Sequence, residues 1–159
     1  MMNNKALAEK QSIFKRSSTT YYYSSLFFTG QVKSDVFTLY AFVRYADDLV
    51  DAIPAKADEF RAFRALTEKA INGSHAHNHI IDDFVELSRR KNFDPSWTHA
   101  FFDSMESDLT KNSYESYEEL QTYMYGSAEV IGLYMCRIFD TPDEALSYAQ
   151  KQGEAMQFI

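Results

Sequence analysis

Apolar and polar positions between Val32 and Asp51 predict a long helix with two distinct faces. One face is apolar at steps of three and four positions, as in the buried stripe of an amphipathic helix. Its residues are Val32, Val36, Leu39, Val43, Ala46 and Val50. The second face follows the same spacing and carries Phe37, Tyr40, Arg44, Asp47, Asp48 and Asp51. Pro54 predicts the end of the helix, which we therefore expect to cover Val32–Ile53.

The carboxylates of the second face stand at electrostatically unfavourable positions. Asp47 and Asp51 stand one helical turn apart, where like charges repel, and they lie near a helix C-terminus, where the macrodipole disfavours anions. A divalent cation would relieve both costs, because Mg²⁺ binds carboxylates together with phosphate oxygens. Arg44 would suit a phosphate as a forked donor. A solvated acidic face that Arg44 partly neutralises is the other interpretation, and the spacing leaves both open.

The remaining chain shows the same helical period with short breaks. Further helices are predicted over Asp58–Ile71, Ile80–Arg90, Asp94–Leu109, Tyr117–Phe139 and Thr141–Ile159. Asn72-Gly73 is typical of a helix end, and Asp94-Pro95 is typical of a helix start. The pattern predicts an all-α fold in a single helical domain, residues 1–159, without a sheet.

Two glycines interrupt the predicted helix Tyr117–Phe139. Its apolar stripe consists of Leu120, Met124, Ala128, Ile131, Met135 and Ile138. Gly126 and Gly132 each cost such a helix about 1 kcal/mol relative to alanine. Close approach of another helix explains them, and close approach of a slender ligand is the alternative.

Several polar clusters are candidates for chemistry. The run Ser17–Thr20 precedes aromatic residues and suits either helix capping or hydrogen bonds to phosphate oxygens. Alternate histidines would share one side of an extended strand and bind zinc, but their surroundings resemble a loop; they are His75, His77 and His79. Asp103 and Asp108 are five positions apart, so we expect two exposed acids.

Composition excludes some classes of protein. The formal net charge of −7 argues against nucleic acid as a partner. The one cysteine, Cys136, fits a reducing compartment, and no apolar run approaches the length of a membrane span. The N-terminal residues lack the apolar core of a signal peptide, so we expect a cytoplasmic protein without a transmembrane segment.

Four stretches together resemble the N-terminal part of the squalene/phytoene synthase family, and the bacterial phytoene synthases most closely. They are Ser17-Ser18 before an aromatic run, LYAFVRYADDLVD (Leu39–Asp51), YMYGSAEVIGL (Tyr123–Leu133) and GEAMQ (Gly153–Gln157). The resemblance implies the isoprenoid synthase fold. It also implies a prenyltransferase that uses Mg²⁺, with Mn²⁺ as an alternative.

The resemblance also assigns roles to individual residues. It implies that Asp47, Asp48 and Asp51 bind metal and that Tyr40 and Arg44 act with Asp47 and Asp51 in catalysis. Substrate would be bound by Ser17, Ser18, Tyr40, Arg44, Tyr125 and Gln157. Glu129 departs from the small residue of the squalene-synthase branch, which affects the predicted channel wall.

Gln157 begins the family's second aspartate-rich motif, and the sequence stops two residues later. We therefore expect a chain truncated before that motif and inactive alone. The implied reaction joins two geranylgeranyl diphosphates head to head into phytoene through a cyclopropyl intermediate, with peripheral membrane contact for the lipophilic product. Alternatives are a squalene or dehydrosqualene synthase that uses farnesyl diphosphate, and a non-catalytic helical protein that binds prenyl diphosphate.

Overall fold

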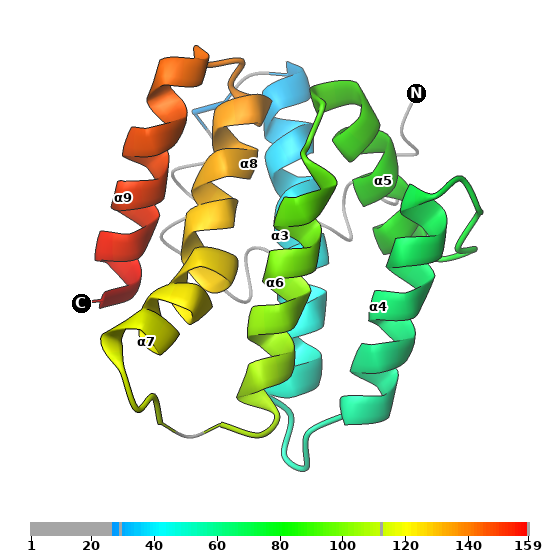
Figure 1. The fold of residues 1–159 in the computed structure, drawn as a ribbon. Helices are drawn as coiled ribbons and strands as arrows, with labels where there is room; N and C mark the ends of the chain where they lie inside the picture. Colours follow the sequence, from blue (N-terminus) through cyan, green and yellow to red (C-terminus); the bar gives the residue numbers. More distant parts are fainter. Residues whose placement is uncertain (1–26, 29, 112, 159) are drawn as a thin grey trace.

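The computed structural model describes residues 27–28, 30–111 and 113–158, and all its regular elements in these ranges are helical (Figure 1). They are α3 (Gly30–Val50), α4 (Ala57–Ile71), α5 (His79–Lys91), α6 (Pro95–Asp108), α7 (Tyr117–Met124), the π-helical segment η1 (Tyr125–Glu129), α8 (Val130–Ile138), the 3₁₀ turn η2 (Asp143–Ala145) and α9 (Leu146–Phe158). This confirms the predicted all-α fold. Ser17 and Ser18 lie outside the described residues. None of the described helices is long and apolar enough to cross a bilayer.

Helix α3 occupies the centre of the bundle and contacts α4, α5, α6 and α8 (Figure 1). Because neighbours surround it, it is buried well beyond the predicted stripe. Phe42 stacks on Phe84 of α5 with ring centroids 3.7 Å apart. Phe37, which the spacing placed on the polar face, is fully buried in the core. The polar face is therefore confined to the C-terminal half of α3.

The end of α3 comes earlier than predicted. The helix stops at Val50, not Ile53, and Asp51 follows in a bend. The backbone N–H of Asp51 still donates to the carbonyl of Asp47 at 2.9 Å, and Lys56 N–H closes the turn on Leu49. Asp51 therefore stays beside the last turn of α3.

Capping residues define the starts of α5 and α6. Asn78 accepts from the N–H groups of Ile80 and Ile81, so α5 begins at His79. This overturns the idea of three histidines alternating along a strand. Asp94 accepts from Ser96 N–H, with Pro95 in the first turn of α6, as the sequence predicted.

The predicted helix Tyr117–Phe139 is interrupted by η1. A π-helical turn inserts one extra residue, which rotates the following residues about the helix axis. The predicted stripe consequently holds at Met124 and Ile138 but not between them, where Ala128, Ile131 and Met135 are only partly buried. The buried positions of α8 are Val130, Leu133, Tyr134, Cys136 and Ile138.

Glycines mark the places where helices touch backbone to backbone. A Cβ added to Gly126 would lie 2.1 Å from the carbonyl oxygen of Ala100 on α6. A Cβ at Gly132 would lie 2.7 Å from the carbonyl oxygen of Ala149 on α9. Close helix packing therefore accounts for both glycines.

Replacing Gly126 by alanine should destabilise the protein by about 2 kcal/mol, because the methyl group overpacks the contact with α6. Helix propensity alone predicts the opposite sign, a gain of about 1 kcal/mol. Urea unfolding measures the change, and Ala65→Gly, the reverse substitution at an exposed position of α4, calibrates propensity. A Gly126→Ala protein as stable as the parent would contradict the tight contact.

Candidate functional site

The C-terminal ends of α3 and α6 both reach the lower end of the bundle in Figure 1 and bring acidic side chains together. Burial raises the pKa of Asp47, and the negative charges of Asp51, Asp48 and Asp108 raise it further. Burial also raises the pKa of Asp108, with a contribution from Asp51. Carboxylates from two helices therefore share one region and disfavour each other's charge.

Arg44 partly compensates this repulsion. Its Nη1 lies 2.5 Å from Asp47 Oδ2, and its Nη2 lies 2.6 Å from Asp48 Oδ1. Both pairs are formed within one helix, between residues one turn apart. The Nε atom of Arg44 is buried and finds no hydrogen-bond acceptor among the described residues. Its two ion pairs therefore leave this buried N–H group without an acceptor in the described part of the chain.

Asp108 is a site residue that the sequence did not reveal. We expected exposed acids at both Asp103 and Asp108, and only Asp103 fits: it is 67% exposed and pairs with Arg64 at 2.7 Å. Asp108 is half-buried and lies within electrostatic range of Asp47 and Asp51. The sequence separation between Asp108 and the aspartates of α3 does not predict that they are close, because the packing of α6 on α3 brings them together.

Tyr123 is the second residue that the sequence left unassigned. Its hydroxyl donates to Asp108 Oδ2 at 3.1 Å. Burial raises the pKa of Tyr123, and the charges of Asp108 and Asp47 add to the shift. The phenol is therefore protonated at neutral pH and is a donor beside the carboxylates.

The remaining predicted residues are less closely tied to this cluster. Tyr40 is half-buried on α3, one helical turn before Arg44. Burial raises the pKa of Tyr125, followed by the charges of Glu129 and Asp94, not those of the α3 aspartates. Gln157 is exposed in the last turn of α9. Substrate contact by these three residues stays a prediction.

The chemistry of this cluster fits a hard cation and an anionic group, although its present geometry does not form a finished metal site. Carboxylate oxygens are the ligands that Mg²⁺ prefers, and the raised pKa of Asp47 reports a repulsion that a cation would relieve. Among the residues that the structure describes, no three His, Cys, Asp or Glu side chains are arranged to hold a metal ion. Arg44 engages Asp47 and Asp48 instead. Metal binding by Asp47, Asp48 and Asp51 stays a prediction.

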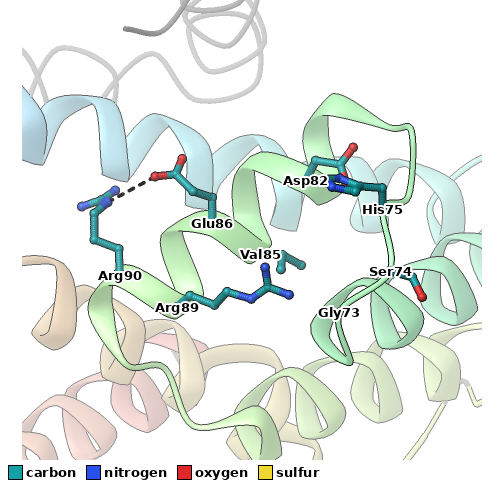
Figure 2. Close-up of a pocket in the computed structure, with 8 residues that line it drawn as sticks. All are labelled: Gly73, Ser74, His75, Asp82, Val85, Glu86, Arg89 and Arg90. Atoms are coloured by element: carbon teal, nitrogen blue, oxygen red, sulfur yellow. Dashed lines mark ion pairs between the residues drawn. The ribbon is translucent and has the colours of Figure 1, made fainter.

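A surface hollow of about 520 Å³ lies elsewhere, between the α4–α5 loop and α5 (Figure 2). Its lining residues are Gly73, Ser74, His75, Asp82, Val85, Glu86, Arg89 and Arg90. The charged groups here are already engaged: Arg90 binds the buried Asp35 at 2.6 Å, and Asp82 accepts from Ala76 N–H. Of the candidates from the sequence, His75 lines this hollow, and none of the residues that the family resemblance implicates does.

Comparison with known proteins agrees with the fold and with the family resemblance of the sequence. The profile of the Squalene/phytoene synthase family matches residues 14–159. The 15-cis-phytoene synthase of Pantoea ananas is 25% identical, aligned over 98% of this chain and 55% of its own length. The bifunctional lycopene cyclase/phytoene synthase of Pyrenophora tritici-repentis is 39% identical, over 50% of this chain and 15% of that protein. A crystal structure of a dehydrosqualene synthase superposes with a TM-score of 0.81 at 25% identity, over 96% of this chain and 54% of its own.

The chain belongs to the squalene/phytoene synthase family, whose members are prenyltransferases acting on prenyl diphosphates. A squalene synthase from Alicyclobacillus acidocaldarius, at 20% identity and a TM-score of 0.76, shares the fold. The chain spans about half the length of the phytoene synthases that match most of it. Family membership therefore identifies the class of chemistry, and the particular reaction is a matter for proposal.

The acidic cluster predicts a dependence of stability on pH. Because folding raises the pKa of Asp47, the folded protein binds this proton more tightly than the unfolded chain, and stability falls as the pH rises above the ordinary aspartate value. Replacing Asp51 by asparagine removes one repulsive charge. We expect the free energy of unfolding at pH 7 to rise by roughly 0.3 kcal/mol, since solvent screens the pair.

Chemical denaturation between pH 4 and pH 8 measures this effect. Asp58→Asn is the matched control, because the Asp58 side chain is fully exposed and its loss should leave the slope unchanged. A lower stability of Asp51→Asn at pH 7, or an unaltered pH profile, would contradict the proposed repulsion.

Proposed function

We propose that the chain binds a prenyl diphosphate together with Mg²⁺ at the C-terminal end of α3, as part of a synthase of the phytoene type. The observation that carries this proposal is the crowding of Asp47, Asp51 and Asp108 beside Arg44. A bundle that needed only solubility would spread these charges. A cation would balance the negative charges of the aspartates, and a phosphorylated ligand would balance the positive charge of Arg44.

Each residue has a distinct part in this proposal. Asp47, Asp48 and Asp51 would hold Mg²⁺, which neutralises the diphosphate and promotes its departure as a Lewis acid. Arg44 would turn from Asp47 and Asp48 toward diphosphate oxygens, a geometry that its forked guanidinium favours. In this arrangement the metal takes over the role of counter-ion that Arg44 has in the structure.

The aromatic side chains near the cluster would act on the carbon skeleton. Loss of diphosphate leaves an allylic carbocation, which the faces of Tyr40 and Tyr125 can stabilise. Attack by the double bond of a second geranylgeranyl diphosphate, with loss of a proton, gives a cyclopropyl intermediate. A second ionisation, followed by rearrangement and loss of another proton, leads to phytoene. The Tyr123 hydroxyl, which donates to Asp108, would hold that carboxylate in place beside the metal-binding aspartates.

Farnesyl diphosphate is the second candidate substrate. The dehydrosqualene synthase that matches in structure and the 4,4'-diapophytoene synthase of Staphylococcus haemolyticus, 24% identical over 91% of this chain, favour it. Phytoene synthases predominate among the relatives and favour geranylgeranyl diphosphate. Comparing the two affinities under the same conditions distinguishes the candidates.

Calorimetric titration of the chain with geranylgeranyl diphosphate should show binding that requires Mg²⁺. Asp47→Asn should abolish the dependence on Mg²⁺, because it removes a charged ligand and relieves the repulsion without metal. Asp58→Asn and His77→Ala should bind as the parent does. Equal affinity with and without Mg²⁺ in the parent chain, or an Asp47→Asn variant that keeps the dependence, would refute the proposed site.

A further inference from the structure

The side chain and backbone of Tyr123 are held at three separate points. Ser104, 4% exposed on α6, donates from Oγ to the Tyr123 carbonyl at 2.9 Å. Asp108, one turn further along α6, accepts from the Tyr123 hydroxyl at 3.1 Å. Tyr114, from the loop between α6 and α7, packs its ring on that of Tyr123, with centroids 5.0 Å apart and planes inclined by 39°. The first two contacts fix the ends of Tyr123, and the third fixes its ring.

Tyr114 is itself anchored to the same part of α6. Its hydroxyl lies beside the side chain of Ser107, which lowers the pKa of Tyr114 against the larger effect of burial. Ser107 Oγ in turn donates to the carbonyl of Ser104 at 2.7 Å. Tyr114 is half-buried in the described part of this loop, so the contact joins the loop to the last turns of α6.

The backbone next to Tyr123 is irregular, so contacts with neighbouring residues are needed to orient its side chain. The π-helical segment begins two residues later, at Tyr125, and π turns have weaker geometry than α turns and occur often at functional sites. Gly126 lets α6 approach, since a Cβ there would lie 2.0 Å from Ser104 Oγ. The direction of the Tyr123 side chain is therefore set by its neighbours and not by a regular helix alone.

We propose that Tyr114 is a positioning residue for the prenyl diphosphate site: its ring holds Tyr123 so that the phenol hydroxyl stays on Asp108, beside Asp47. The inference rests on the proposed function for its consequence in binding. Tyr114 acts through Tyr123 and need not touch the substrate. Offset aromatic pairs of this kind stabilise an arrangement beyond the area that they bury.

Two variants separate the ring of Tyr114 from its hydroxyl. Tyr114→Phe keeps the ring contact and loses only the hydroxyl beside Ser107, whereas Tyr114→Ala loses both. Tyr148→Ala removes a tyrosine that is 74% exposed on α9 and serves as the matched control. The first readout is NMR of ¹³C-labelled tyrosine rings, with the Tyr123 signal assigned through Tyr123→Phe.

Tyr114→Ala should shift the Tyr123 ring signal and increase its ring-flip rate. It should also weaken Mg²⁺-dependent binding of geranylgeranyl diphosphate by about two- to tenfold. Tyr114→Phe should keep the Tyr123 signal near its original position and restore the affinity. Tyr148→Ala should change neither quantity.

The two readouts distinguish failure of this inference from failure of the proposed function. If the parent chain binds with Mg²⁺ and Tyr114→Ala alters neither the Tyr123 signal nor the affinity, the positioning role is overturned. A moved Tyr123 signal with unchanged affinity overturns it as well. If the parent chain shows no Mg²⁺-dependent binding, the proposed function falls, and the NMR signal still decides whether Tyr114 orders Tyr123.

Discussion

The packing of α3 on nearly all sides is the constraint on which the rest of the structure depends. Contacts with α4, α5, α6 and α8 bury the residues from Asp35 to Leu39, together with Ala41 and Phe42. Asp35 illustrates the cost: it is 2% exposed and needs a two-pronged bond from Arg90 at 2.6 and 2.9 Å. The other carboxylates of this helix and of the bend that follows it, Asp47, Asp48 and Asp51, lie at its C-terminal end.

At this end of the bundle, the charges of the aspartates are only partly balanced within the protein. Arg44 serves as an internal counter-ion for Asp47 and Asp48. The arrangement is not fully neutral, because Asp51 and Asp108 still raise the pKa of Asp47. Residues placed for binding and not for stability commonly show such residual repulsion. An incoming cation and diphosphate would exchange partners with Arg44 and would not need an empty cavity.

Local signals in the sequence were sufficient for most of the fold and for part of the site. The apolar stripe of α3, the cap at Asp94 and the turn at Asn72-Gly73 each act within a few residues, so they could be predicted. The π-helical segment could not, because the extra residue is stabilised by contacts of Gly126 with α6. Asp108 and Tyr123 were not predicted as site residues for a related reason, because tertiary packing brings them to the aspartates.

Paramagnetic broadening by Mn²⁺ tests the central claim most directly, namely that the ends of α3 and α6 form a cation and diphosphate site. Amide signals of the chain are recorded with Mn²⁺ and inorganic diphosphate. The account predicts the strongest broadening at Asp47, Asp51, Asp108 and Tyr123. Broadening centred on His75–His79, or no broadening when diphosphate is present, would contradict it.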